Sequence, residues 1–297
     1  MTLRSLLAAT TLVIGTVPVA TAEAQEVRKL TGVRFSYPTY TPSGEILYES
    51  AAGGDWNIFR IPAEGAGQDG AAIERLTDSP SLDRMPNMSP DGRYIVFISD
   101  RAGNYDVWRM DAEGDNVQQL TTSEEHEIHP YWTPDSRRIV FNRQVRGERL
   151  YAIWSMAADG MDEREILRDN DLNSYAQTSP DGRWLVFDKW WNNDESNGEI
   201  MLLELATGEL TRLTENDVYD GYPAWFPDGR HIVYASEIEG VFKLIRLDIS
   251  TRQQEQLTFG PGGDQRPAVS ADGTRILFNR NLDDSIEIYE LVLKDGR

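Results

Sequence analysis

The chain has 297 residues, no cysteine and a formal net charge of −20 at pH 7. Such a charge argues against nucleic acid or an anionic membrane as the partner, and it favours cations or a basic protein surface. Without cysteine the fold contains no disulfide, and the N-terminus offers no thiol for a lipid anchor of the bacterial lipoprotein kind.

The first 24 residues predict a secretory signal peptide. Arg4 precedes an apolar stretch over residues 6–19, and small residues up to Ala24 provide cleavage sites. The stretch is short for a membrane-spanning helix. The alternative is a frayed N-terminal helix of the mature fold. We therefore expect an exported, periplasmic protein whose mature domain covers residues 25–297, with no transmembrane segment.

One turn sequence then recurs six times, at spacings of 44 to 48 residues. The clearest copy is Ser-Pro-Asp-Gly-Arg at Ser89–Arg93. The six copies are Thr41–Glu45, Ser89–Arg93, Thr133–Arg137, Ser179–Arg183, Phe226–Arg230 and Ser270–Thr274. A fixed period of this size indicates a propeller or another repeat array. The Asp and Gly of each copy are interpreted as structural, because Asp bonds nearby backbone in tight turns and Gly supplies a positive φ.

Each repeat is predicted to contain four short strands. In the second repeat these lead into Met88, then cover Tyr94–Ser99, Asp106–Met110 and Val117–Thr121. Such β-branched and aromatic runs, bounded by Gly, Pro, Asp and Asn, are typical of strands and turns. A closing Leu-Thr recurs at residues 76–77, 120–121, 213–214 and 257–258.

The two ends of the chain predict how the array closes. The last repeat stops at the turn Lys294–Arg297, before its closing strand, whereas Glu26–Thr31 contains a spare Leu-Thr. A ring in which the N-terminal strand completes the last blade accounts for both observations and removes exposed sheet edges. The predicted fold is all-β: one six-bladed β-propeller of four-stranded blades, over residues 25–297.

The first strands of the repeats predict a ring of side chains at the mouth of the central channel. Three residues before the position of Pro86 stand Phe35, Asp83, Glu127, Asn173, Asp220 and Asp264, and one residue before it stand Tyr37, Met85, His129, Tyr175, Tyr222 and Arg266. Two interpretations of the acids remain: they cap loops or pair with Arg84 and Arg266, or they form an open binding funnel for a cation, a sugar or a basic peptide. The candidate binding residues are Asp83, Arg84, Glu127, His129, Tyr175, Asp220, Tyr222, Asp264 and Arg266.

Signals of catalysis are sparse. The sequence contains no Gly-x-Ser-x-Gly nucleophile motif, and His126 and His129 are expected on the face opposite to His231, which disfavours a three-histidine metal site. A pair of ring carboxylates could still do acid–base work on a glycosidic bond. We assign no catalytic residue.

Two further features near residue 190 are left open. Residues 193–198 with Glu204 loosely follow a calcium-loop pattern, although a polar hairpin loop is favoured and no cofactor is expected. Trp190 and Trp191 precede this loop. One of them is either exposed, where it suits sugar stacking or a protein contact, or packed between blades.

The repeat at residues 89–101, followed by an aromatic strand and Leu120-Thr121, resembles the repeat of the TolB β-propeller. TolB is the periplasmic member of the Tol-Pal envelope system. The resemblance covers residues 26–297 and implies a six-bladed propeller that binds protein. TolB proteins also carry an α/β domain that engages TolA, whereas here propeller strand directly follows the predicted signal peptide. Similar repeats occur in propellers attached to peptidases and in polysaccharide lyases.

Two functions follow from these observations. The first is a non-catalytic, monomeric periplasmic propeller that binds an envelope or periplasmic protein, one with a basic surface, through the channel mouth. The alternative is a carbohydrate-active protein, either an oligosaccharide binder or a polysaccharide lyase, that uses the same funnel.

Overall fold

The structure is a computed structural model that describes residues 26–30, 35–51, 53–62, 73–191, 197–283 and 285–294. The predicted signal peptide and most of the calcium-like loop lie outside the described residues. Within these ranges the regular secondary structure is β-strand, and there is no helix long and apolar enough to cross a membrane.

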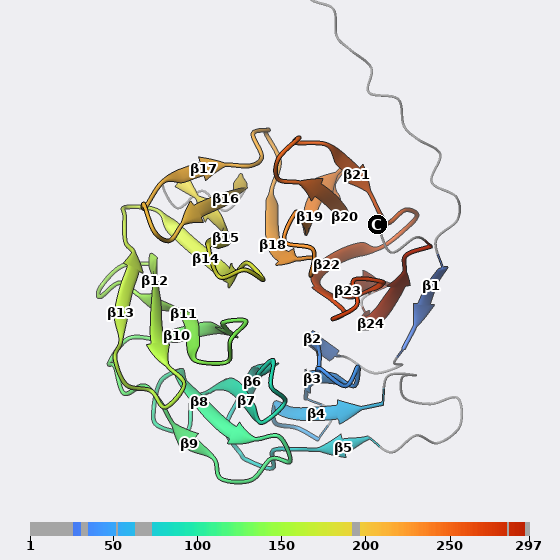
Figure 1. The fold of residues 1–297 in the computed structure, drawn as a ribbon. Helices are drawn as coiled ribbons and strands as arrows, with labels where there is room; N and C mark the ends of the chain where they lie inside the picture. Colours follow the sequence, from blue (N-terminus) through green and yellow to red (C-terminus); the bar gives the residue numbers. More distant parts are fainter. Residues whose placement is uncertain are drawn as a thin grey trace, which may run out of the picture.

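Six four-stranded antiparallel sheets surround a central axis as the blades of a propeller (Figure 1). Blade 1 consists of β2 (Phe35–Tyr40), β3 (Ile46–Ser50), β4 (Asn57–Ile61) and β5 (Glu74–Arg75). Blade 2 consists of β6 (Asp83–Met88), β7 (Tyr94–Ser99), β8 (Asp106–Asp111) and β9 (Gln118–Gln119). Blade 3 consists of β10 (Glu127–Trp132), β11 (Arg138–Gln144), β12 (Tyr151–Ala157) and β13 (Arg164–Leu167). Blade 4 consists of β14 (Leu172–Thr178), β15 (Trp184–Trp190), β16 (Gly198–Glu204) and β17 (Leu210–Arg212). Blade 5 consists of β18 (Asp220–Trp225), β19 (His231–Ile238), β20 (Val241–Asp248) and β21 (Gln254–Gln256). Blade 6 consists of β22 (Gly263–Val269), β23 (Arg275–Leu282), β24 (Ser285–Val292) and β1 (Glu26–Lys29). This arrangement confirms the predicted fold class.

The N-terminal strand closes the ring as the sequence predicted. β1 pairs antiparallel with β24 from Glu26 opposite Val292 to Lys29 opposite Tyr289, and the two strands lie side by side in Figure 1. The Leu30 N–H then donates to the Ile288 carbonyl at 2.9 Å. The leucine of each complete Leu-Thr pair makes the same bond in its own blade. The first strand in the chain therefore serves as the fourth strand of the last blade.

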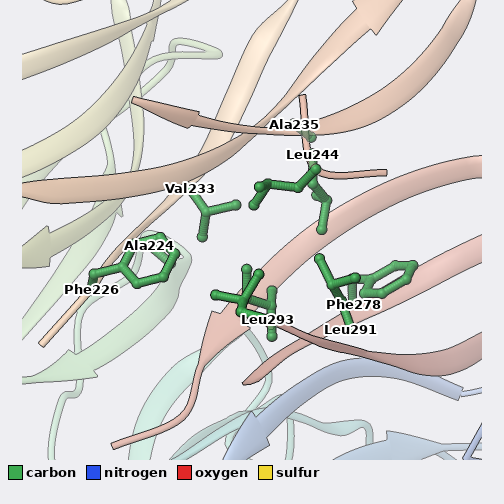
Figure 2. Packing of buried hydrophobic residues seen from close by; sticks show 10 residues of the cluster. Ala224, Phe226, Val233, Ala235, Leu244, Phe278, Leu291 and Leu293 are labelled. Atoms are coloured by element: carbon green, nitrogen blue, oxygen red, sulfur yellow. The ribbon is translucent and has the colours of Figure 1, made fainter. Parts of the chain in front are cut away.

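Apolar side chains on the two faces of each blade pack against its two neighbours. Between blades 5 and 6, Phe226 and Val233 meet Phe278, Leu291 and Leu293, all of them buried (Figure 2). A comparable buried cluster lies at each of the other blade interfaces. Successive strand residues point to opposite faces, so the near-continuous apolar runs of the second strands are what a blade with two buried faces requires.

The recurrent turn is held by its own side chains. The Ser89 hydroxyl donates to the Asp91 carboxylate at 2.7 Å, and that carboxylate accepts the Arg93 N–H at 3.2 Å. Gly92 has a φ of 73°. The third repeat has Ser136 in place of the glycine, yet keeps a φ of 60°. These bonds agree with the structural role that the sequence assigned to the Asp and Gly.

The Leu-Thr pair has a structural role too. The Thr121 hydroxyl accepts the Val107 N–H at 2.8 Å and donates to the Glu127 carboxylate at 2.9 Å. The hydroxyls of Thr77, Thr214 and Thr258 accept the equivalent N–H of their own blades. Because a buried N–H without a partner is costly, the threonine satisfies the third strand where the fourth has ended.

Backbone bonds define two faces of the propeller. Ala112 N–H donates to the Arg93 carbonyl at 3.0 Å, which joins the two kinds of turn on one face, called here the turn face. Glu127 N–H donates to the Tyr105 carbonyl at 2.7 Å. This bond joins the linker after Leu-Thr to the loop between the second and third strands. These linkers and loops form the opposite, channel-mouth face.

Candidate functional site

The first strand of every blade contains a bulge at the same position. The strand register shifts there, and one residue of each bulge takes a left-handed conformation with φ between 50° and 57°. These residues are Tyr37, Met85, His129, Tyr175, Tyr222 and Arg266. Left-handed backbone is uncommon for residues with bulky side chains, and its presence at equivalent places is a marker of functional geometry. They are the inner ring that the sequence predicted.

The side chains of this inner ring meet on the propeller axis. The Tyr37 hydroxyl lies 2.7 Å from the Tyr175 hydroxyl and 3.3 Å from His129 Nε2. The rings of His129 and Tyr175 stack at 3.8 Å between centroids, and Tyr222 meets Tyr175 edge-on at 4.7 Å. The Arg266 guanidinium lies 4.2 Å from the Tyr37 ring centroid. Five blades thus contribute to one interlocked cluster, called here the axial plug.

The four predicted ring acids are not exposed. Asp83, Glu127, Asp220 and Asp264 each have a relative exposure of 0%. The expectation of an open acidic funnel is wrong, because three of these carboxylates turn toward an arginine of their own blade. Asp83 pairs with Arg101 at 2.7 Å, Glu127 with Arg143 at 2.7 Å and Asp264 with Arg280 at 2.6 Å.

The pairing expected for Arg84 and Arg266 is wrong as well. Arg84 donates to the buried carboxylate of Glu49, with Nη2 at 2.7 Å. Arg266 Nη1 donates to the Ser36 hydroxyl at 2.8 Å, and no carboxylate of the described residues lies within ion-pair distance of it. The arginines of the inner strands therefore do not neutralise the ring acids.

Burial moves the pKa values of several groups around the axis. Burial, followed by the nearby Arg266 charge, lowers the pKa of His129 to about 3, so this imidazole is neutral at pH 7. Burial raises the pKa of Asp188 to about 8, against a bond from the Tyr219 hydroxyl that favours the ionised form. Burial also raises the pKa of Asp220, one of whose carboxylate oxygens has no hydrogen-bond partner among the described residues.

A pocket of about 410 Å³ opens on the channel-mouth face between blades 3 and 4. It is lined by Ile128, His129, Gln144, Arg149, Tyr151, Leu172, Ser174, Tyr175 and Trp190. Two plug residues form its inner wall, and the exposed Arg149 stands at its rim. We call it the mouth pocket. It combines apolar and aromatic walls with a few polar groups, the usual composition of a binding site.

Trp190 is positioned in this pocket by a glycine. A Cβ on Gly198, directly opposite in β16, would lie 2.1 Å from the Trp190 indole nitrogen. Trp190 also packs on Tyr219, with ring centroids 5.5 Å apart. Trp191 instead lies under Arg212, 4.8 Å from the ring centroid. The tryptophan that the sequence singled out near the channel mouth is therefore Trp190.

Sequence reasoning found His129, Tyr175 and Trp190 but missed the rest of the mouth pocket. Gln144, Arg149 and Tyr151 flank the loop between the second and third strands of blade 3. The residues were missed because only the first strands were aligned.

A second cavity, of about 490 Å³, lies on the turn face between the same two blades. Its walls include Pro134, Pro180 and Leu205, with the turn carboxylates of Asp135 and Asp181. Those carboxylates are already bonded within their own turns, Asp135 by Thr133 at 2.7 Å and Asp181 by Ser179 at 2.6 Å. The mouth pocket is the stronger candidate because it adjoins the axial plug and because the indole N–H of Trp190, in its wall, has no hydrogen-bond partner among the described residues.

The residues considered as metal ligands lie far apart in the structure. Glu204 ends β16 beside the turn face, where it accepts Arg183 at 3.3 Å, so it lies at the far end of the strand from the calcium-like loop. His126 accepts the Tyr105 N–H at 3.1 Å on the channel-mouth face, whereas His231 pairs with Asp228 at 2.6 Å near the turn face. Over the described ranges no three His, Asp or Glu side chains are placed to hold a metal ion together.

Comparisons with known proteins converge on one family. The family model described as TolB beta propeller domain matches residues 9–195 and 179–297. Over 210 residues, 70% of this chain and 34% of the relative, the chain is 30% identical to a protein named Protein TolB homolog from Chlorobium chlorochromatii. The matches span 39% and 34% of the length of two curated relatives, little more than a third.

Solved structures show the same fold. TolB from Acinetobacter baumannii superposes with a TM-score of 0.67 at 17% identity, over 89% of this chain and 65% of that one. An oligogalacturonate lyase from Vibrio parahaemolyticus gives a TM-score of 0.60 at 13% identity, over 94% of this chain and 96% of that one. At these identities the likeness extends to the fold alone.

Proposed function

The chain belongs to the TolB β-propeller domain family, and we propose that it is an exported, non-catalytic propeller that binds another envelope or periplasmic protein through its channel-mouth face. The family and the TolB-named relative support the class of partner. The predicted signal peptide supports export.

The observation that carries the proposal is the mouth pocket. Its volume of about 410 Å³ accommodates one or two side chains of a partner. Trp190, Tyr151 and Leu172 provide apolar contact, and Arg149 and Gln144 provide donors. Protein interfaces concentrate their binding energy at such aromatic and arginine anchors around a desolvated pocket. The net charge of −20 adds a long-range attraction for a basic partner.

The burial of the ring acids supports a non-catalytic role. A general acid or base must come within hydrogen-bond reach of the substrate, directly or through one water. Asp83, Glu127 and Asp264 are instead enclosed and bonded to arginines. Their charges stabilise the inner strands of their blades and are not presented to a ligand.

Site-specific photo-crosslinking in living cells tests this proposal. A photoreactive amino acid in place of Tyr151 should give one dominant crosslinked protein. The matched control replaces Met161, a residue of the same blade on the turn face that is 69% exposed. Tyr151→Ala and Arg149→Ala should each weaken binding of the identified partner about 10-fold or more, whereas Met161→Ala should not. Equal crosslinking from both positions would contradict a role for the channel-mouth face.

A carbohydrate ligand is the second candidate, because Trp190 and Tyr151 also provide the flat apolar surfaces that sugars stack on. The purified protein should be applied to a glycan array beside the Tyr151→Ala variant. Saturable binding of an oligosaccharide, lost in that variant, would favour the second candidate over the first.

A further inference from the structure

The axial plug contains a positive charge that forms no ion pair with any carboxylate of the described residues. The Arg266 guanidinium lies 4.2 Å from the ring centroid of Tyr37 and 5.6 Å from that of Tyr222. Its Nη1 donates to Ser36, and its Nε is shielded from solvent without a hydrogen-bond partner among the described residues. The Arg266 side chain is only partly exposed, and a charge largely withdrawn from water is costly unless it is paired or fully hydrogen-bonded.

The aromatic neighbours of Arg266 supply no negative charge. Burial raises the pKa of Tyr37 to about 12, and burial also raises the pKa values of Tyr175 and Tyr222, so all three phenols are neutral at pH 7. His129 is neutral because burial and Arg266 itself lower its pKa to about 3. Of these groups, Tyr37 and Tyr222 contact the guanidinium, and they do so through their ring faces.

The nearby carboxyl groups are already neutralised or protonated. Glu49 binds Arg84 at 2.7 Å and the Met85 N–H at 2.7 Å, so its charge is shared with Arg84. Asp188 has a pKa of about 8 because it is buried, and it therefore keeps its proton at pH 7 for the most part. The sum over this part of the axis is one unpaired positive charge.

A small cavity adjoins this charge. It measures about 20 Å³, and its polar lining comes from Arg266, Tyr37, Tyr131, Tyr175, Tyr222 and Gln177. Space of this size holds one water-sized species. Phenol and amide side chains can donate to an anion placed there. Two proline rings, of Pro223 and Pro267, complete the wall.

We propose that the axial cavity binds one small monovalent anion of halide size, chloride in ordinary salt, as the counter-ion of Arg266. A monovalent charge cancels the unpaired charge of the axis. The size of the cavity excludes sulfate, phosphate and organic carboxylates. The axial cavity shares Tyr175 with the mouth pocket but none of its other lining residues, and the proposal does not depend on the partner proposed above.

Bromide is the direct probe, because it mimics chloride and scatters anomalously. A crystal of the purified protein soaked in sodium bromide should show an anomalous peak in the axial cavity that Arg266 lines. The Arg266→Met variant should lack that peak. The variant Arg146→Met removes a cation that is 81% exposed on the channel-mouth face, and it should keep the peak. An axial cavity without bromide in the wild-type protein would overturn the proposal.

Thermal unfolding gives an independent result if Arg266→Met fails to fold or crystallise. At equal ionic strength, replacing gluconate with chloride should raise the Tm of the wild-type protein saturably, by about 2–5 °C, since only the smaller anion fits. Equal Tm values in the two salts would reject the site. A rise in Tm with chloride that is absent in the wild type and appears in Asp188→Asn would also reject the site. Ionised Asp188 would then be the counter-charge of Arg266.

Discussion

Replacing Leu30 with alanine should destabilise the whole propeller, although Leu30 lies only a few residues beyond the predicted signal peptide. Its side chain is 4% exposed and packs with Leu277 and Ile288 of blade 6 against Ile46 and Tyr48 of blade 1. A buried Leu→Ala change costs about 2–5 kcal/mol through lost contacts and the remaining cavity. Because a domain is stable by only about 5–15 kcal/mol, this is a large fraction. At about 2–4 °C per kcal/mol for a domain of this size, the Tm should fall by about 5–15 °C.

Two matched variants test the reasoning by urea and thermal unfolding. Leu213 occupies the same place in blade 4, is 6% exposed and donates to the Ile200 carbonyl at 2.7 Å. If β1 is a full member of blade 6, Leu213→Ala and Leu30→Ala should cost the same within about 1 kcal/mol. Val27 lies in β1 and is a surface residue with a relative exposure of 37%. Val27→Ala should therefore change stability by less than about 0.5 kcal/mol. A Leu30→Ala variant as stable as Val27→Ala, beside a destabilised Leu213→Ala, would refute ring closure by the N-terminal strand.

Two other predictions concern protonation and the mouth pocket. Between pH 6.5 and about 3 the unfolded chain binds a proton on His129 that the folded protein does not bind, so the contribution of His129 to stability falls with falling pH. Between pH 3.8 and about 8 the folded protein keeps a proton on Asp188 that the unfolded chain loses, so the contribution of Asp188 to stability falls with rising pH. Between pH 3.8 and 6.5 the two contributions oppose each other, so in this range the urea midpoint of His129→Gln should fall with rising pH and that of Asp188→Asn should rise. Gly198→Ala should displace Trp190, shift its fluorescence and weaken partner binding, since the new Cβ would meet the indole at 2.1 Å; Gly53→Ala, which meets nothing within 4 Å, should do neither.

The architecture could be predicted because its signals are local and repeated. The Asp91 turn and the Leu120-Thr121 pair each satisfy backbone groups of their own blade, so the same short sequences recur from blade to blade. Ring closure was predictable for the same reason. The spare Leu-Thr at the N-terminus makes in blade 6 the backbone bond that Leu120 makes in blade 2.

The ring acids were wrongly expected to be exposed, because the arginines that pair with them lie on another strand. Glu127 stands opposite Arg143 in the pairing of β10 with β11, and Asp264 stands opposite Arg280 in the pairing of β22 with β23. Opposite charges on directly facing strand residues attract at close range. Aligning the second strands together with the first would have shown these pairs. Convergence on the axis was correctly inferred, but only the residues at the bulges converge.

The bulges in the first strands could not be predicted from the sequence. Tyr, Met, His and Arg share one left-handed conformation at six equivalent positions, so no residue preference signals it; the blade geometry imposes it. Each such residue costs about 1–3 kcal/mol, and the strain persists only because the surrounding structure over-determines it. In return, the bulges direct side chains from five of the blades to a common point that a regular strand would not reach. The frame of the propeller is fixed by the turns and the closing pairs, which leaves the choice of these side chains to decide what the axis can hold. Here that choice combines neutral aromatic rings with a single unpaired arginine, an arrangement suited to holding one small anion.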